Sequence, residues 1–508
     1  MKRAAWLLLC SLGCGPVRPP HETPGALSWG LLQEGRPTEA SAQWPRFAPD
    51  ETVESLVSPG GRFRIHYSRQ GPNAVADLDA VMTVARTYDA VADFYTGLGY
   101  LTPPEDVWVP GEHGGDGRFD VYLVDFAGRA DGAYRLEGCL EGDTRCTGYM
   151  LQENDFAGYA YRTYEEAVDT VASHEFFHAV QAVYHPHLGS VASEGSAVWA
   201  TERFQPALDD LERFSRAYLS QTDRSLTLDP DGPAQSFGYG TGLFFQFLDE
   251  RFGADVVRAL WEQAAREPAA PWPVLLDTVL RRDRGADFDT AFTEFSQWNL
   301  STGARAREGQ GYARGGGYMG LAPAARTLPV NEPSVRVTSA SARYFEVEGG
   351  SEGVSVAYLP RDGAEAPALH LLVAAVDEHS VLRVARAEGP GPLAARVSAT
   401  DATRVVVAVV DGRNEGTGRY GQLCITGTST ENPCAEEGPP EPSPGGCQAS
   451  PGTLAWPLLL MPLLRRRMKG PQPSSMTKVR GDYSNGDGSG RHSKGTVSVL
   501  FNQFSSRQ

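Results

Sequence analysis

Apolar residues in the first part of the chain recur at helical spacing. From 75 to 95 an apolar side chain returns every three or four positions, which predicts an amphipathic helix. Alternating apolar and polar residues predict short strands at 62–67 and 120–126. Further apolar runs predict helices over 204–220, 242–252, 255–266, 274–280 and 287–300.

The pattern changes from helical to alternating after a glycine-rich stretch at 309–320. Turn signals such as Asp411-Gly412 separate the alternating segments. The sequence therefore predicts an α+β protein in which a mixed segment, 55–325, precedes a β-sandwich of about a hundred residues over 330–430. The strands expected in this sandwich are 335–337, 345–347, 354–356, 369–376, 381–384 and 403–410.

One predicted helix carries candidate chemistry. It opens at Thr163-x-x-Glu166, a pattern typical of a capping box, and contains His174-Glu175-x-x-His178. Two histidines four residues apart leave one helix face about one turn apart, as a single zinc ion requires of two neutral imidazoles. Glu175 then lies beside the metal, where its carboxylate can take a proton from water. The motif predicts metal-assisted hydrolysis of a peptide or similar acyl bond.

The alternative is a buried histidine pair without function. Such a pair, together with a glutamate, would place polar groups on an apolar helix at a cost in free energy, which favours the metal site.

A second helix is predicted to start within 192–202 and to carry acidic residues. Its Glu194-Gly195-x-Ala197 resembles the Glu-Gly-x-Ala segment of gluzincin metallopeptidases, in which the glutamate is the third zinc ligand. The resemblance implies that Glu194, in the first turn of this helix, completes a Zn²⁺ site with the two histidines, and that Glu175 is the general base.

The spacing between these motifs leaves alternatives open. Fifteen residues separate His178 from Glu194, fewer than is usual in that family, and about a dozen of them are expected to form the loop. Glu202 is therefore the alternative third ligand. His185 and His187, near the end of the first helix, are possible competitors in a rearranged site.

The segment 236–248 resembles the Tyr-x-x-Gly segment that opens a later helix in aminopeptidase-like gluzincins. The resemblance implies that the Tyr239 hydroxyl helps to hold the oxyanion, as a donor toward charge that develops in the transition state. The alternative is a packing tyrosine whose hydroxyl is satisfied elsewhere.

Together these motifs resemble those of a group of secreted metalloproteases of myxobacteria over about 55–325. The resemblance implies a zincin-like catalytic domain, a small sheet with active-site helices, that acts on a protein or peptide. We expect 148–152 to be the sheet edge beside the cleft, where substrate would bind by adding a strand.

Composition narrows the class of protein. With 508 residues and 41% hydrophobic content, the chain is long enough for two folded units with tails. A formal charge of −17 argues against a nucleic-acid partner, since nucleic acids are bound by basic faces. The sequence does not indicate an oligomeric state.

The N-terminal segment has the layout of an export signal over 1–19. Lys2-Arg3 precede an apolar stretch and then small residues, so we expect an extracellular or cell-surface protein. Cys14 is a candidate for lipidation, with simple cleavage as the alternative. The polar, proline-rich 20–54 predicts a linker or pro-segment.

Cysteine spacing predicts two local disulfides in an exported chain. Cys139 and Cys146 bracket a hydrophilic loop, and Cys424 and Cys434 would join the last strand to the linker that follows. Metal binding by the first pair is the weaker alternative, because two cysteines alone make a poor zinc site.

The C-terminal part reads as a stalk and an anchor. A Pro/Gly linker over 431–450 contains Cys447, and an apolar segment ends in Arg465-Arg466-Arg467. This layout over 451–467 resembles the myxobacterial C-terminal sorting signal, which implies anchoring at the membrane or cell surface. A polar tail, 468–508, follows where that signal normally ends the chain, and we expect it to be disordered.

Two function classes follow. The first is an exported zinc-dependent metallopeptidase, with a zinc-dependent hydrolase of non-peptide bonds as a weaker variant. The second is a surface-anchored binding or adhesion protein on an inactive protease scaffold. The intact His174, Glu175 and His178 favour the first, because loss of any one of them would silence the enzyme.

Overall fold

The structure is a computed structural model that describes residues 35–39, 42–111, 113–142, 144–228, 236–349, 353–361, 368–427 and 433–434. All of these fall within one compact unit, Met1–Glu437. The unit mixes helices with several sheets, which agrees with the predicted mixture of α and β structure. The predicted export signal, sorting segment and tail lie outside the described residues, as does most of the 431–450 linker.

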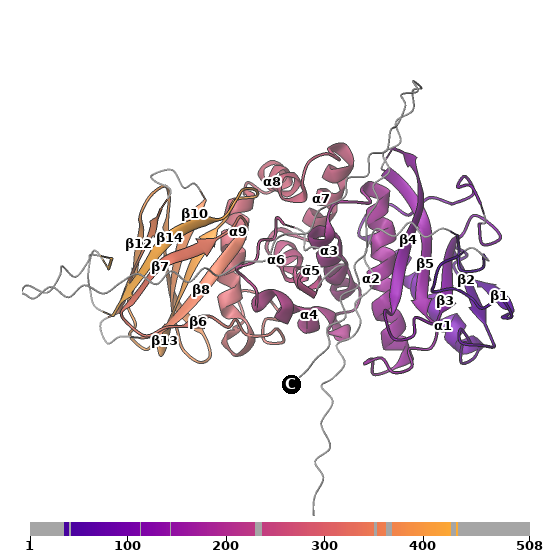
Figure 1. Ribbon diagram of the computed structural model, residues 1–508, viewed down its shortest axis with the longest axis horizontal. Coiled ribbons are helices and arrows are strands. Elements are labelled where there is room, and N and C mark those ends of the chain that lie inside the picture. The colour runs from indigo at the N-terminus through magenta and orange to yellow at the C-terminus, as the bar shows by residue number, and fades with distance from the viewer. Residues whose placement is uncertain are drawn as a thin grey trace, which may run out of the picture. The chain divides into compact units, whose positions relative to one another are not determined.

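The first sheet has five strands in the order β1-β2-β3-β5-β4 (Figure 1). Strands β2, β3 and β5 are parallel, and β1 and β4 are antiparallel edge strands. Helix α1, Leu78–Gly97, makes the crossover from β2 to β3 that a parallel pair requires. The strands are β1 Val53–Val57, β2 Phe63–Ser68, β3 Phe119–Val124, β4 Gly132–Glu141 and β5 Thr144–Glu153.

The predicted position of the sheet edge is wrong. Residues 148–152 belong to β5, which is hydrogen-bonded on both sides, and the edge is β4. The apolar run in β5 reflects burial between two neighbouring strands and under a helix, and strand order cannot be read from such a run.

Helices α1 and α2, Tyr164–Tyr184, pack on one face of this sheet. They meet over Phe63 of β2, whose ring contacts Tyr88 of α1 and Phe176 of α2 at centroid distances of 5.4 and 5.2 Å. Thr163 caps α2 as predicted, because its side chain accepts a hydrogen bond from the Glu166 N–H at 3.1 Å. The motif-bearing helix is thus fixed between the sheet and the helices that follow.

The opposite face of the sheet is covered by the described residues that precede β1. Phe47 joins an apolar cluster with Tyr122 and Leu151. Arg36 is buried among carboxylates, and its guanidinium donates to Glu137 at 2.7 Å and also to Asp106 and Asp120. The described part of the predicted 20–54 linker or pro-segment therefore packs against the sheet, on the face away from α2.

Seven helices follow α2 among the described residues. The observed α6 and α7 have the predicted bounds, whereas the helix predicted over 204–220 is interrupted by a 3₁₀ turn at Pro206–Leu208. The break lies at Asp209, whose left-handed backbone (φ 55°) separates the 3₁₀ turn from α4. These helices are α3 Ser190–Phe204, α4 Asp210–Leu219, α5 Ser236–Gly240, α6 Gly242–Phe252, α7 Asp255–Arg266, α8 Trp272–Asp283 and α9 Phe288–Trp298.

Two further sheets follow, of five and four strands, ordered β11-β10-β13-β8-β6 and β12-β9-β14-β7. Side chains from both sheets form one apolar cluster. The prediction missed β12, because only Leu393 and Val397 at its ends are buried and no alternation is visible. The strands are β6 Ala324–Ala325, β7 Val330–Val337, β8 Ser341–Glu348, β9 Val354–Pro360, β10 Leu369–Val376, β11 Val381–Glu388, β12 Leu393–Val397, β13 Arg404–Asp411 and β14 Arg419–Thr426.

The five-stranded member of this pair also contacts the helices. Leu372 and Val376 of β10 belong to the large apolar cluster of the helical part, while Leu371 faces the cluster between the sheets. The Tyr344 hydroxyl donates to the Ser296 carbonyl oxygen of α9 at 2.7 Å. Because β10 is buried on both faces, its sequence is apolar except for His370.

Both predicted disulfides are present. Cys139–Cys146 joins β4 to β5 at opposed positions, and Cys424–Cys434 ties β14 to the segment beyond it. Within the described ranges, no helix is both long enough and apolar enough to cross a membrane.

Candidate metal centre

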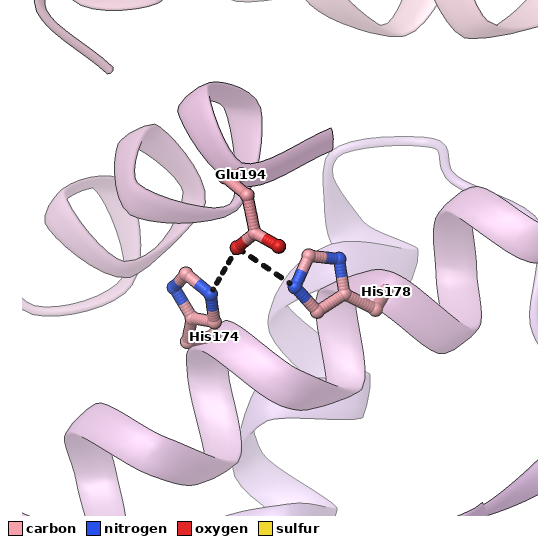
Figure 2. Close-up of side chains that lie close together, drawn as sticks. All are labelled: His174, His178 and Glu194. Atoms are coloured by element: carbon pink, nitrogen blue, oxygen red, sulfur yellow. Dashed lines mark hydrogen bonds and ion pairs between the residues drawn. The ribbon is translucent and has the colours of Figure 1, made fainter. Parts of the chain in front are cut away.

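His174, His178 and Glu194 come together as the sequence predicts (Figure 2). Both histidines leave the same face of α2, and Glu194 points down on them from α3. One Glu194 carboxylate oxygen, Oε2, lies 3.2 Å from His174 Nε2 and 3.4 Å from His178 Nε2. The three candidate ligand atoms all lie within 4.8 Å of one another, so the group could hold a metal ion.

The two separations from Glu194 Oε2 fit a small tetrahedral ion. Nitrogen and oxygen ligands about 2.05 Å from one zinc ion, at tetrahedral angles, lie about 3.3 Å apart. The two measured separations, 3.2 and 3.4 Å, bracket that value. Two imidazoles and one carboxylate are also a donor set that catalytic zinc sites use.

Burial and charge prepare the same three side chains. Glu194 is fully buried, which alone would raise its pKa, but the neighbouring histidines outweigh burial and hold the Glu194 pKa below its usual value. Burial lowers the pKa of His174, which favours the neutral imidazole that a metal needs. Burial disfavours the charged form of His178, but the Glu194 carboxylate outweighs burial and raises the His178 pKa. The electrostatic field at His178 therefore favours a positive charge beside Glu194.

The connection between the two ligand-bearing helices is shorter than predicted. Helix α2 continues to Tyr184 and α3 begins at Ser190, so the loop is 185–189 and Glu194 lies in the second helical turn. Both helices are buried along this stretch, and the packing extends each of them beyond its motif. His185 lies in the loop, with its Nε2 3.1 Å from the Pro268 carbonyl oxygen. Its Nδ1 accepts a hydrogen bond from the His187 N–H, so both ring nitrogens of His185 have partners outside the candidate metal cluster.

Glu202, the alternative third ligand, is not part of the cluster. Its Oε1 accepts a hydrogen bond from Arg314 Nη1 at 2.6 Å. Glu202 is buried two helical turns beyond Glu194, where it ties α3 to the glycine-rich segment.

Glu175 lies against the edge strand. Its Oε2 accepts from the Tyr134 N–H at 3.1 Å, whereas its Oε1 is buried and has no hydrogen-bond partner among the described residues. A Cβ on Gly132 would lie 2.9 Å from Glu175 Cγ, so only glycine lets β4 approach this closely. Burial raises the pKa of Glu175 to about 8. Gly132 and Tyr134 carry no sequence signal of this role, because strand packing alone brings them to α2.

Tyr239 lies beside the candidate ligands. Its ring centroid is 5.6 Å from that of His174, and Phe214 of α4 stacks on it at 4.9 Å. Burial raises the pKa of Tyr239 well above its usual value, so the phenol keeps its proton and can donate a hydrogen bond. The structure thus places the predicted oxyanion residue in the neighbourhood of the site.

Gln181 also belongs to the site, and sequence reasoning did not single it out. Its Oε1 lies 2.8 Å from His178 Nδ1, and its Nε2 donates to the Ser193 carbonyl oxygen at 2.9 Å and to Ser196 Oγ at 3.0 Å. The only available signal was its position one turn after His178 on the same helix.

No family model and no curated protein sequence matches the chain. Among solved structures, it is similar to the pre-peptidase C-terminal domain of a collagenase from Bacillus anthracis, at 11% identity and TM-score 0.16 over 21% of this chain and 97% of that one. It is also similar to a periplasmic inhibitor of g-type lysozyme from Aeromonas hydrophila, at 14% identity and TM-score 0.15 over 21% of this chain and 98% of that one. A third similar structure is a family GH115 4-O-methyl-alpha-glucuronidase, at 12% identity and TM-score 0.15 over 65% of this chain and 54% of that one. Similarities this low carry no argument about the site.

Proposed function

We propose that this protein is an exported zinc metallopeptidase of the gluzincin type, with a zincin-like catalytic part followed by a β-sandwich. The observation that carries the proposal is the buried cluster of His174, His178 and Glu194, with Glu194 Oε2 3.2 and 3.4 Å from the two imidazole nitrogens, next to the buried carboxylate of Glu175. A structural ion pair would not need a second buried carboxylate beside it, with one oxygen that has no hydrogen-bond partner among the described residues.

Each side chain has a role in this proposal. Zinc held by the two histidines and Glu194 would supply a Lewis acid that polarises a carbonyl group and makes water more acidic. Glu175 takes a proton from the attacking water and returns it to the leaving amine. Burial raises the pKa of Glu175, which makes its carboxylate a stronger proton acceptor than an exposed one. The Tyr239 hydroxyl donates toward the oxyanion.

The edge strand supports a peptide substrate over other acyl compounds. Strand β4 has no partner on its outer side within the described sheet, and its backbone contacts Glu175 through the Tyr134 N–H. An extended peptide can add to an edge strand by backbone pairing. This pairing would bring a peptide bond beside the general base.

The two disulfides support export, since such bonds persist in oxidising compartments. Anchoring at the cell surface through Cys14 or through 451–467 belongs to the same proposal and rests on the sequence alone.

The test combines metal analysis with peptide hydrolysis. We expect the purified protein to carry about one zinc per chain and to lose activity with chelator. Glu175→Gln should keep the zinc and lower turnover by about 10²- to 10⁴-fold, because a general base is lost while every ligand remains. The exposed Glu165, on the first turn of the same helix, provides the control Glu165→Gln. Turnover of the Glu175 variant within a few-fold of wild type, or a wild-type protein that binds no zinc, would contradict the proposal.

A further inference from the structure

Gln181 touches both halves of the candidate metal centre. It is fully buried on α2, one turn beyond His178, and Ser193 and Ser196, which its amide contacts, flank Glu194 on α3. The indole of Trp261 on α7 also donates to Ser196 Oγ, at 3.3 Å. A single amide thus contacts one ligand directly and holds the helix that carries another.

The partners of this amide fix its orientation. The Ser193 carbonyl oxygen can only accept a hydrogen bond, so the group that faces it must be the NH₂ of Gln181. The amide oxygen therefore faces His178 Nδ1 at 2.8 Å, and an amide oxygen can only accept. Nδ1 of His178 must then carry a proton. The lone pair of the neutral imidazole is left on Nε2, the nitrogen that lies 3.4 Å from Glu194 Oε2.

We propose that Gln181 is a positioning residue that locks His178 in the Nδ1-protonated tautomer and so presents Nε2 to the metal. The inference rests on the proposed metal site. Without the amide oxygen, a neutral imidazole divides between two tautomers, and its ring loses the hydrogen bond that holds Nδ1. Partners of this kind on metal-bound histidines change metal affinity by about 10- to 100-fold.

Three variants separate positioning from packing. Gln181→Met keeps most of the side-chain volume but offers no comparable acceptor. Gln181→Glu restores an acceptor for His178 Nδ1 but loses the donors to α3. Ser196→Ala leaves the Gln181 oxygen in place and removes one of its anchors, so it reports on packing alone.

The measurements are zinc affinity by chelator competition and the thermal midpoint of each variant. We expect Gln181→Met to lower zinc affinity at least tenfold. Gln181→Glu should recover most of it, and Ser196→Ala should stay within a few-fold of wild type even where its thermal midpoint falls. Wild-type zinc affinity in Gln181→Met, or an equal loss in Ser196→Ala, would overturn the inference. A wild-type protein that binds no zinc would instead refute the proposed function.

Discussion

Glu194 and Glu202 are both buried glutamates on α3, but their partners differ. Glu194 faces two histidines, whereas Glu202 pairs with Arg314, which also contacts Asp209 at 2.6 Å. We therefore expect Glu194→Gln to lower zinc affinity by at least about tenfold and to abolish most activity. Glu202→Gln should keep the metal and lower the thermal midpoint, because it weakens the attachment of the glycine-rich segment. Zinc loss in the Glu202 variant, with zinc retained in the Glu194 variant, would show that Glu202 and not Glu194 is the third ligand.

Asp210, the first residue of α4, gives a prediction about pH. Its side chain is buried, and burial raises its pKa from 3.8 to about 7. The folded state then holds a proton that the unfolded state releases, so stability falls as pH rises from about 4 to 7. Asp210→Asn removes this cost. Its gain in free energy of unfolding should be about 2–3 kcal/mol larger at pH 8 than at pH 5.

Denaturant unfolding at the two pH values measures this gain. Asp79→Asn, at an exposed position in the first turn of α1, is the matched control. An Asp210→Asn gain that does not change between pH 5 and pH 8 would show that the carboxylate is ionised in the folded protein throughout.

The candidate ligands could be named from the sequence, whereas the residues around them could not. His174, Glu175 and His178 lie within five residues of one helix, so helical spacing alone is enough to predict that they lie close together. Gly132, Tyr134 and Gln181 reach the site through strand packing, helix packing and amide orientation, none of which leaves a periodic trace.

At the scale of elements, Arg36 connects the N-terminal segment to the sheet. It is 2% exposed and forms ion pairs with Asp106, Asp120 and Glu137. Arg36→Leu would leave these carboxylates without their cation, and breaking a buried pair costs about 3–5 kcal/mol. We expect a loss of that size in the free energy of unfolding by urea.

The exposed Arg46 supplies the control, because Arg46→Leu should change stability by less than about 0.5 kcal/mol. A small effect of Arg36→Leu would mean that the segment is a dispensable linker. The expected loss would mean that any processing cut that leaves the protein stable falls before Arg36.

Sequence periodicity located most elements but not their neighbours. Helices α6 and α7 were predicted with their observed bounds, because each has a continuous apolar face. The edge position of β4 and the five-residue loop 185–189 were not predicted, because strand order and helix extension depend on tertiary packing. Whether 55–325 and 330–430 are separate domains stays a prediction.

For the molecule as a whole, shared side chains predict joint unfolding of the helices and the later sheets. Leu372 belongs to the apolar cluster of the helical part, although it lies on β10. Leu372→Ala should cost about 2–5 kcal/mol and shift a single calorimetric transition that covers both parts. Leu371→Ala, on the face between the sheets, is the comparison. Two separate transitions, with only one moved by Leu372→Ala, would show that the parts unfold independently.

The packing around Gly195 explains why a glycine follows the glutamate in the Glu-Gly-x-Ala motif. A Cβ at this position would lie 2.4 Å from Thr241 Oγ1 and 2.9 Å from Phe245, and across the same crossing a Cβ on Gly242 would lie 2.9 Å from Val198. The glycine is therefore required by the close approach of α3 and α6, and it contributes no atom to the candidate metal site. A related chain in which α6 stood farther away could replace this glycine and keep the chemistry. Searches that demand the glycine would pass over such a chain, so the histidine pair and the glutamate make the better query.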